Sequence, residues 1–293
     1  MSTCAIIVTY NRLELLKECL EAINGQTRTV DYVLIVNNCS TDGTKEYLSS
    51  IASESNIIYN SPTNMGGAGG FSKGIKIATE RTNCDYFWIM DDDTIPSSNC
   101  LEALLSHATE LNNKFGFLAS NVRWKDGTPT NLPMIGSDWS IKVSSGLIEL
   151  QTASFVSLLV QRQSVRSLGL PYKEFFIWDD DAEYTMRLGQ INPGYMCADA
   201  LVTHKSTAKG VATGIVHDVP ERIKRYFYLY RNDFFIQKSY GSRAKVIRTI
   251  LHDLTDAMRC LLLAKTNRIQ RFRIVLKGLF AGLFFKPVRE EVD

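Results

Sequence analysis

The 293-residue sequence contains no apolar run approaching the roughly 18 residues that a membrane-spanning helix requires. Residues 1–8 show neither a basic leader nor a cleavage site, so we expect no signal peptide and a cytosolic protein. The seven cysteines include no CxxC pair, which argues against a disulfide framework or a zinc site. We therefore expect reduced thiols that are buried in the core. Internal repeats and low-complexity linkers are also absent.

Two nucleotide-binding motifs are missing as well. No G-x-G-x-x-G follows the first apolar run, which argues against an NAD-dependent dehydrogenase, and no glycine-rich loop ends in Lys-Ser or Lys-Thr as a Walker A loop does. The net charge is only +2, but it is unevenly distributed. Residues 1–220 carry 17 Lys or Arg and 24 Asp or Glu, whereas residues 221–293 carry 16 and 7. No groove-reading motif accompanies the basic part, so we expect no nucleic-acid partner.

The first 220 residues alternate short apolar runs with segments of helical periodicity. This rhythm predicts an α/β fold with a mostly parallel sheet flanked by helices. The expected strands lie at residues 4–9, 32–36, 57–59, 86–90, 116–122, 155–160 and 201–204. Beyond Pro220 the pattern changes to long basic helices. We therefore expect a catalytic domain over residues 1–220 and a helical region over residues 221–293.

Asp91-Asp92-Asp93 directly follow the fourth predicted strand. In open α/β sheets, ligands bind outside the carboxyl ends of the strands. Alternate residues of an extended chain can aim at one point, and carboxylate oxygens suit Mg²⁺ or Mn²⁺ that carries a diphosphate. The alternative is a solvated acidic turn whose Asp caps the next helix.

Residues 64–71, Asn-Met-Gly-Gly-Ala-Gly-Gly-Phe, form a second unusual segment. We expect a glycine-rich loop followed by a helix through about Thr82. Glycine lets the backbone approach a ligand closely, and a helix N-terminus favours anionic groups. A tight structural turn is the alternative.

A second acidic cluster, Asp179-Asp180-Asp181, stands near Glu183 behind an aromatic lead-in that ends in Trp178. Crowded carboxylates raise one another's pKa, which is one route to a general base. The Trp178 indole can stack on a sugar face. The alternative for the acidic cluster is the start of a helix, where acidic residues are favourable. His204 ends a short predicted strand, and a structural role is its alternative.

Taken together, these segments resemble the family 2 glycosyltransferases, which have the GT-A fold. Residues 6–12, Ile-Ile-Val-Thr-Tyr-Asn-Arg, and residues 36–44 look like the two opening nucleotide-site motifs of that family. The resemblance covers roughly residues 4–235. Residues 64–71, residues 178–183 and Tyr230-Arg231-Asn232 are similar to bacterial galactofuranosyltransferases and the related rhamnosyltransferase-like branch.

The resemblance implies site residues with distinct roles. A divalent metal, Mn²⁺ or Mg²⁺, would be held by Asp91, Asp93 and His204. The nucleotide-sugar site would comprise Thr9, Arg12, Asn38, Asp42, Asn64, Gly66, Gly67, Asp91, Asp92 and Trp178. Asp181 would be the general base on the acceptor hydroxyl, with Asp180 beside it. This chain has three consecutive aspartates where many relatives have two acidic residues, and Asn38 replaces a common aspartate.

The implied reaction is a single displacement with inversion at the anomeric carbon. The expected donor is UDP-galactofuranose, and the expected acceptor is a glycan or a lipid-linked saccharide in cell-surface polysaccharide synthesis. One alternative is a rhamnosyltransferase that uses dTDP-rhamnose. Another is a non-catalytic protein that binds sugar nucleotides or serves as a membrane scaffold.

The basic region carries two apolar stripes at helical spacing. They comprise Val246, Ile250, Leu254, Met258 and Leu261 in one helix, and Phe272, Val275, Leu276, Leu279, Phe280 and Leu283 in the next. Basic amphipathic helices of this type lie on anionic membrane surfaces, so we expect a peripheral protein on the inner face of the cell membrane. The alternative is a helical cap on the catalytic domain or on a second subunit of a homo-oligomer.

Overall fold

The computed structural model describes residues 1–206 and 214–292. By its contacts the chain divides into two compact units. The sheet unit comprises residues 1–173, 181–209 and 289–293, and the helical unit comprises residues 174–180 and 210–288. The helical unit thus begins before the predicted boundary at 220 and includes a short earlier segment. Assignment of catalysis to residues 1–220 stays a prediction.

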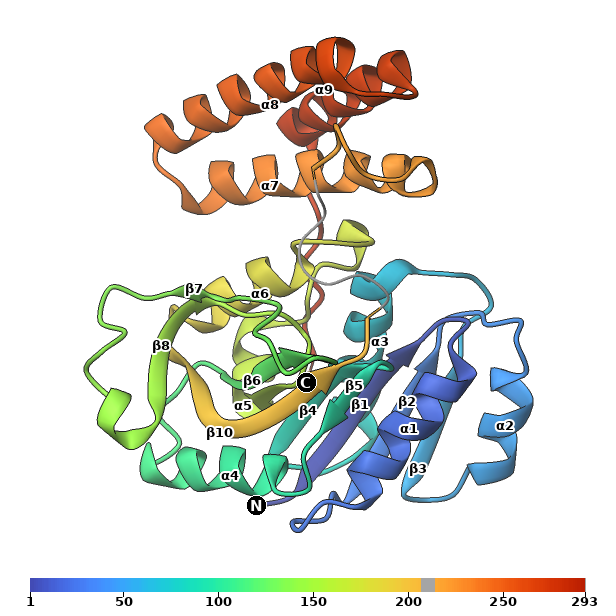
Figure 1. The fold of residues 1–293 in the computed structure, drawn as a ribbon. Coiled ribbons are helices and arrows are strands. Elements are labelled where there is room, and N and C mark those ends of the chain that lie inside the picture. The colour runs from blue at the N-terminus through green and yellow to red at the C-terminus, as the bar shows by residue number, and fades with distance from the viewer. Residues whose placement is uncertain (207–213, 293) are drawn as a thin grey trace. The chain divides into compact units, whose positions relative to one another are not determined.

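The sheet unit is a mixed α/β structure with helices on both faces of one sheet (Figure 1). Its strands are β1 (Thr3–Thr9), β2 (Tyr32–Asn37), β3 (Asn56–Asn60), β4 (Tyr86–Asp91), β5 (Thr94–Pro96), β6 (Leu118–Trp124), β7 (Met134–Ile135), β8 (Leu147–Thr152), β9 (Leu158–Gln161) and β10 (Gly194–His204). Its helices are α1 (Leu13–Asn24), α2 (Thr44–Ile51), α3 (Gly66–Arg81), α4 (Cys100–Glu110), α5 (Arg162–Leu168) and α6 (Asp180–Leu188), which starts in the helical unit. Short 3₁₀ turns occupy Val143–Ser145 and Lys173–Phe175.

The strand order is β3-β2-β1-β4-β9-β6-β10-β8-β7, with β5 paired to β10. The sheet is mixed and not mostly parallel as predicted: the half from β3 to β4 is parallel, whereas the rest is largely antiparallel. Strand β9 then runs antiparallel to both of its neighbours, and β10 pairs in parallel only with β6. The chain leaves β1 for β2 on one side and reaches β4 on the other, which makes the carboxyl end of β1 a topological switch point.

Alternation along β1 divides the core between the two faces of the sheet. Ala5 and Ile7 pack with residues of α1 and α4, whereas Ile6 and Val8 pack with residues of α3 and α6. Successive strand residues point to opposite faces, and both faces are covered, so β1 is apolar from Cys4 to Val8. The cysteines are unpaired thiols, and all except the half-buried Cys39 are buried, in line with the sequence expectation.

Two local predictions need correction. The glycine-rich segment is not a loop before a helix, because α3 already begins at Gly66. A Cβ at Gly70 would lie 2.6 Å from Val8 Cγ1, and one at Gly74 would lie 2.7 Å from Ile6 Cγ2, so these glycines let α3 approach β1. The predicted strand at residues 201–204 is the end of the longer β10, which starts at Gly194.

The helical unit contains the 3₁₀ turn Pro220–Arg225, α7 (Tyr226–Tyr240), α8 (Arg243–Leu263) and α9 (Arg268–Phe284). Its core includes Tyr226, Tyr230, Ala257 and Val275, with Trp178 packed against it. Glycines again set the closest approach, since a Cβ at Gly278 would lie 2.8 Å from the Phe227 carbonyl oxygen of α7.

The apolar stripes are only partly as predicted. On α8, the exposed large apolar side chains are Ile247, Leu251, Leu254, Met258, Leu262 and Leu263. In the predicted α9 stripe, Val275 and Leu279 are buried against the rest of the unit, and so is Arg271, which donates to the Asp218 carbonyl oxygen. Searched over the described residues, the helices include none with the length and apolarity that crossing a bilayer takes.

Candidate metal and nucleotide site

The carboxyl ends of β1 and β4 lie side by side and carry the first acidic cluster. Asp91 is the last residue of β4 and pairs in register with Val8 of β1. The chain then turns through Asp92 and Asp93 into β5, which pairs antiparallel with the end of β10. In that pairing, His204 stands opposite Thr94, the residue after Asp93. A long-range strand pairing therefore brings the histidine to the aspartates.

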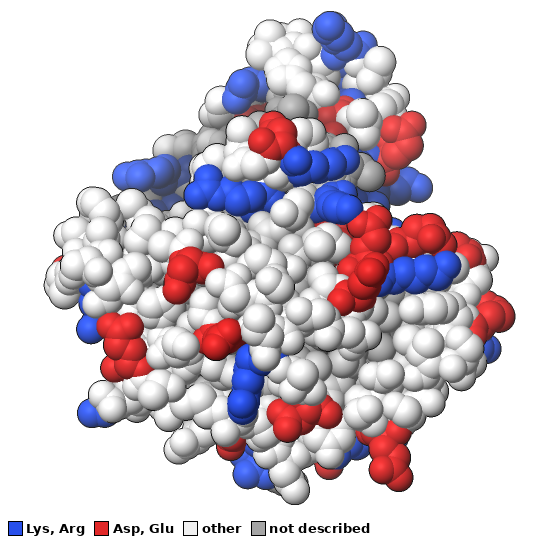
Figure 2. All heavy atoms as spheres, turned by 60° about the horizontal axis from the view of Figure 1, so that its bottom comes forward, with Lys and Arg blue, Asp and Glu red and all other residues white. Residues whose placement is uncertain are grey.

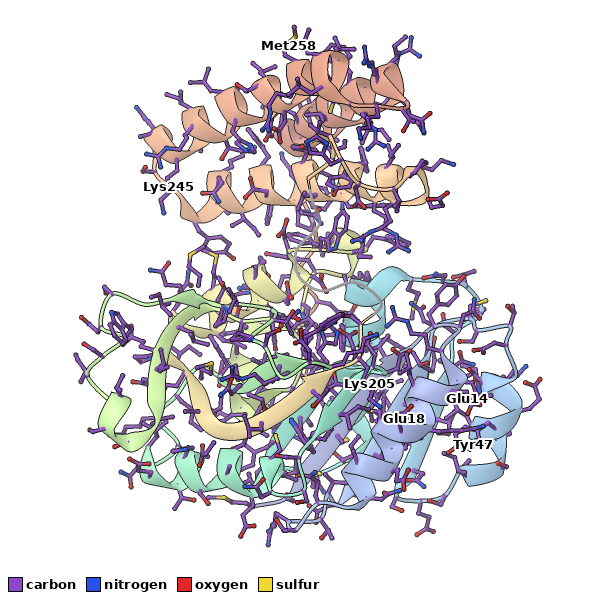
Figure 3. The ribbon with its side chains drawn as sticks, viewed as in Figure 1. Glu14, Glu18, Tyr47, Lys205, Lys245 and Met258 are labelled. Atoms are coloured by element: carbon purple, nitrogen blue, oxygen red, sulfur yellow. The ribbon has the colours of Figure 1, made fainter. Side chains whose placement is uncertain are left out.

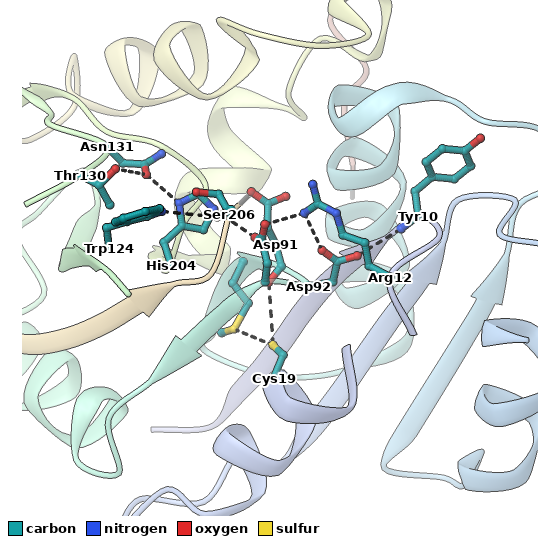
Figure 4. A network of polar contacts seen from close by, with 12 residues as sticks. Tyr10, Arg12, Cys19, Asp91, Asp92, Trp124, Thr130, Asn131, His204 and Ser206 are labelled. Carbon is teal, nitrogen blue, oxygen red and sulfur yellow. Dashed lines mark hydrogen bonds and ion pairs between the residues drawn. The ribbon is translucent and has the colours of Figure 1, made fainter. Parts of the chain in front are cut away.

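The three predicted metal ligands converge at this edge of the sheet. One ligand atom from each of Asp91, Asp93 and His204 lies within 4.8 Å of the other two. His204 Nε2 is 3.1 Å from Asp93 Oδ1, and its Nδ1 is 2.8 Å from Asn131 Oδ1 (Figure 4). Two carboxylates and one imidazole form a donor set suited to a divalent cation, so these residues fit the expected metal.

Arg12 provides positive charge beside the aspartates. Its Nη1 lies 2.5 Å from Asp93 Oδ2 and 3.2 Å from Asp92 Oδ1, and the backbone N–H of Tyr10 donates to Asp92 (Figure 4). Burial lowers the pKa of Arg12, but the neighbouring carboxylates outweigh it and raise that pKa overall. The structure shows Arg12 paired with two aspartates, and its predicted contact with the nucleotide sugar stays a prediction.

The three aspartates differ in how far neighbouring positive groups offset the effect of burial on their pKa values. Burial raises the pKa of Asp91 well above its usual value, with a further increase from Asp93, and burial raises the pKa of Asp92 to about 6 despite Arg12. For Asp93, burial acts in the same direction, but His204 and Arg12 outweigh it and lower the pKa. Crowded buried carboxylates of this kind favour a bound cation, which would stabilise their charged forms.

Lys205, the residue after His204, connects the aspartates with α1. The backbone N–H of Lys205 donates to the Asp93 carbonyl oxygen over 2.8 Å. The Lys205 side chain forms an ion pair with Glu18 of α1, and the two residues lie close together in Figure 3. Thus the residue after His204 ties the end of β10 both to the aspartates and to the first helix.

A second group of predicted residues lies at the end of β2. Asn38 is buried, and its Nδ2 donates to the Gly66 carbonyl oxygen over 2.9 Å while its Oδ1 accepts from the Met65 N–H. Asn64 Oδ1 accepts from the Gly66 N–H and from Asn38 Nδ2. A deprotonated aspartate cannot donate to Gly66, which gives the asparagine at position 38 a structural reason.

Asp42 and Thr9 are two further residues of the predicted nucleotide-sugar site, near the ends of β2 and β1. The Asp42 carboxylate accepts from the Leu13 N–H at the start of α1 and from the Thr44 hydroxyl at the start of α2. Burial raises its pKa, but the hydrogen bonds together outweigh it and lower the pKa. The carbonyl oxygen of Thr9 accepts from the Asn38 N–H over 2.9 Å. Asp42 therefore links the starts of α1 and α2, and any contact with a nucleotide stays a prediction.

The second acidic cluster is built differently. Phe176, Trp178 and Asp179 all have left-handed backbone angles, with φ of 65°, 66° and 64°. Such angles cost about 1–3 kcal/mol each for residues other than glycine, and they persist only where surrounding contacts fix them. Glu183 forms a buried two-point ion pair with Arg187, so it is a structural member of α6.

Asp180 and Asp181 begin α6 directly after this loop. Burial raises the pKa of Asp181, although hydrogen bonds from the Ala182 and Phe155 backbone partly offset it. Trp178 packs edge-on against Tyr226, with ring centroids 5.2 Å apart, and lies under the Arg222 guanidinium. A base role for Asp181 and a sugar contact for Trp178 both stay predictions.

Two contacts at the site were not predicted from any sequence motif. Asn131, which contacts His204, lies between β6 and β7, in a segment where no site residue was predicted. The contact of Arg12 with Asp92 and Asp93 was likewise not predicted, because 80 residues separate the partners in sequence.

On the face drawn in Figure 2, basic and acidic groups both occur among uncharged areas.

The comparisons agree with the class of protein that this fold and site define. Residues 4–144 match the family model described as glycosyl transferase family 2. Galactofuranosyltransferase GlfT1 of Mycolicibacterium smegmatis is 28% identical over 261 residues, which cover 82% of this chain and 84% of the relative. GlfT1 of Mycobacterium tuberculosis (strain ATCC 25618 / H37Rv) is 26% identical over 263 residues, or 83% and 84% of the two chains.

Solved structures show the same fold. A crystal structure of S. aureus TarS has a TM-score of 0.57 and 15% identity, covering 98% of this chain and 44% of that one, so this chain spans less than half of that TarS. GalNAc-T7, crystallised with UDP, GalNAc and Mn²⁺, gives a TM-score of 0.67 at 10% identity, covering 93% of this chain and 54% of that one. The predicted GT-A fold is confirmed. The sequence matches make the chain similar to family 2 glycosyltransferases, galactofuranosyltransferases among them, whereas the solved structures show the fold alone.

Proposed function

We propose that the chain transfers galactofuranose from UDP-galactofuranose, with inversion, to a glycan or a lipid-linked saccharide. The observation that carries the proposal is the convergence of Asp91, Asp93 and His204 at the carboxyl ends of β4 and β10. The galactofuranosyltransferase relatives, which align with more than four fifths of the chain, support the choice of donor sugar.

The first acidic cluster would hold the diphosphate end of the donor through a divalent cation, Mn²⁺ or Mg²⁺. Asp91, Asp93 and His204 would be its protein ligands. Bound there, such an ion supplies Lewis-acid stabilisation of the departing nucleoside diphosphate. Asn131 orients the imidazole through Nδ1, so that Nε2 faces the aspartates, an outer-shell role common at metal sites. Arg12 would keep the negative charge of Asp92 and Asp93 compensated before donor binding.

The second acidic cluster would supply the general base. Asp181 would accept the proton of the acceptor hydroxyl while that oxygen attacks the anomeric carbon from the face opposite the leaving group. The burial that raises its pKa makes the carboxylate a stronger base than an exposed aspartate. No covalent enzyme intermediate is needed in this single displacement.

The remaining predicted residues would line the donor. The starts of α1 and α3 lie at the same edge of the sheet as Asp91, because each follows a strand of the parallel half. Thr9, Asn38, Asp42, Asn64 and Gly66 form the hydrogen-bonded frame of that edge, and Gly67 has open space around its Cα. A backbone that is free of a side chain there allows a phosphate to approach the helix N-terminus.

A donor screen tests the proposal. UDP-galactofuranose, UDP-galactopyranose and dTDP-rhamnose are each offered with a short galactan acceptor, with Mn²⁺ or Mg²⁺ and with EDTA. We expect metal-dependent turnover of UDP-galactofuranose. Preferential use of dTDP-rhamnose would instead establish the rhamnosyltransferase alternative, and donor binding without transfer or hydrolysis would favour a non-catalytic protein.

We also propose that the helical unit binds an anionic membrane surface on the cytoplasmic side. On α8, the exposed residues Ile247, Leu251, Leu254, Met258 and Leu262 recur at helical spacing and form one apolar face, and Met258 projects outward in Figure 3. Arg243, Lys245 and Arg248 lie in the first turns of this helix, and Lys265 and Arg268 follow its end. Basic residues near an anionic surface contribute about 1 kcal/mol each, less at high salt.

Vesicle co-sedimentation tests the membrane proposal. The double variant Leu251→Gln/Met258→Gln should lose binding to phosphatidylserine-containing vesicles, whereas Leu132→Gln, at a still more exposed leucine of the sheet unit, should retain it. Binding that is equal for neutral vesicles would contradict the electrostatic part. A concentration-dependent dimer that the double variant abolishes would identify a second copy as the partner of this face.

A further inference from the structure

The loop from Phe175 to Asp179 accepts hydrogen bonds from two adjacent side chains of α7, Arg231 and Asn232. Asn232 is fully buried in the helical unit, and its Nδ2 donates to three carbonyl oxygens of this loop. The acceptors are those of Phe175 at 3.0 Å, Ile177 at 3.3 Å and Trp178 at 2.9 Å. These are the residues around which the backbone takes its left-handed angles. The unusual loop conformation and the buried amide therefore belong together.

Arg231, the preceding residue, fixes the direction of that amide. Its Nε and Nη2 donate to Asn232 Oδ1 over 3.0 and 2.9 Å, and Nη2 also donates to the Glu174 carbonyl oxygen over 2.6 Å. A guanidinium has no acceptor, so the Asn232 oxygen faces Arg231 and the nitrogen faces the loop. Burial lowers the pKa of Arg231 to about 10, and the group still carries its charge at neutral pH.

The loop contains bulky residues where glycine would fit its backbone more cheaply. Phe176 stacks on Tyr228 with ring centroids 4.8 Å apart, and Trp178 packs on Tyr226. Glycines at the left-handed positions would adopt these angles freely but would leave the loop flexible. The sequence instead keeps three non-glycine residues and fixes their carbonyl groups from α7. Such a loop has one defined conformation where it enters α6 at Asp180.

We propose that Arg231 and Asn232 are positioning residues, which set the place of the Asp180 and Asp181 carboxylates through the Phe175–Asp179 loop. This inference rests on the proposed function, which gives Asp181 its role as the base. Because a misplacement of about 1 Å at a reacting group can cost 10²-fold in rate, holding the loop has a direct kinetic consequence.

The central test is Asn232→Asp, a nearly isosteric change. A carboxylate cannot donate to the three carbonyl oxygens and would be repelled by them. We expect kcat to fall by roughly 10–100-fold, while KM for the donor and the affinity for UDP stay unchanged. In an Asp181→Asn background, measured by single turnover, the same change should cause little further loss. Ser239→Ala, an exposed position on the same helix, is the control.

A second variant keeps the test decisive if Asn232→Asp does not fold. Arg231→Lys retains the charge but cannot hold the amide and the Glu174 carbonyl oxygen with one planar group. It should lower kcat in the same direction, with circular dichroism and the unfolding temperature near those of the parent chain.

Two results would overturn the inference while leaving the proposed function intact. One is an unchanged kcat in a folded Arg231→Lys or Asn232→Asp variant, with Asp181→Asn inactive. The other is a loss that multiplies fully with that of Asp181→Asn, since an effect independent of the base is not positioning of the base. If Asp180→Asn and Asp181→Asn both retain full transfer, the proposed base itself is wrong, and the positioning role is wrong with it.

Discussion

The two acidic clusters of this chain have similar sequences but opposite construction. Asp91-Asp92-Asp93 ends a regular parallel strand, and its charge is met by Arg12 and His204 within the sheet unit. Asp179-Asp180-Asp181 follows an irregular loop, whose conformation is fixed by hydrogen bonds from α7 to main-chain carbonyl groups. The first cluster is organised around charge, and the second around backbone conformation.

This difference suggests a division of labour. A site that collects carboxylates beside an imidazole is suited to bind a cation and an anionic donor. A carboxylate at the start of a helix whose pKa is raised by burial, as that of Asp181 is, is suited to accept a proton. Substitutions in the first cluster should therefore change binding, and substitutions in the second should change turnover.

The largest effect is expected for Asp93→Asn. The change removes an anionic ligand and the partner of both His204 and Arg12. Metal-dependent UDP affinity should fall by more than the roughly 10–100-fold typical of losing an outer-shell partner, and transfer should be abolished. Calorimetry with UDP and Mn²⁺, beside a transfer assay, measures both. The exposed Asp138→Asn should behave as the parent chain.

The next effect should separate the clusters. Asp181→Asn should reduce kcat by roughly 10²–10⁴-fold, the usual cost of a lost general base, while UDP and metal affinity stay near normal. Asp180→Asn is the matched neighbour and should cost less. If Asp180→Asn is inactive and Asp181→Asn is not, the base is the neighbour; if Asp181→Asn loses UDP affinity as Asp93→Asn does, the division of labour is wrong.

Asn131→Ala should have an intermediate effect confined to the first cluster. The His204 ring would lose the hydrogen-bond partner of Nδ1 and with it a fixed orientation. We expect metal affinity to fall about 10–100-fold, with activity recovered at high Mn²⁺ concentration. The exposed Asn83→Ala is the control. An unchanged Mn²⁺ titration would show that the imidazole is held in place without Asn131.

The smallest effects are expected for substitutions of the glycines of α3, the helix that packs on β1. Gly74→Ala would place a Cβ 2.7 Å from Ile6 Cγ2, so we expect a loss of about 1–3 kcal/mol in unfolding free energy. Gly67→Ala meets open space and should stabilise the helix by about 0.4–1 kcal/mol. Urea unfolding measures both. Weaker UDP binding by the stabilised Gly67→Ala variant would support a close approach of the diphosphate, and unchanged binding would argue against it.

Sequence reasoning was strongest where a pattern is local. The end of β4 at Asp91 was predicted within a residue, since an apolar run is a local signal. It failed at the glycines of α3, because glycine composition suggests a loop whereas packing against Val8 and Ile6 requires glycine inside the helix. The exposed apolar face of α8 also differs from the predicted stripe, since it includes Ile247 and Leu251 in place of Val246 and Ile250. Only the packing partners of a helix decide which of two adjacent stripes is covered.

The sequence by itself determined the α/β class, the three carboxylates at a strand end and the family resemblance, because strand periodicity and motif order are written along the chain. Only the tertiary structure decided which groups meet those carboxylates. His204 reaches Asp93 across 111 residues through the pairing of β5 with β10, and Asn131 and Arg12 approach from other elements. Such contacts depend on pairing between distant segments, which no local pattern specifies.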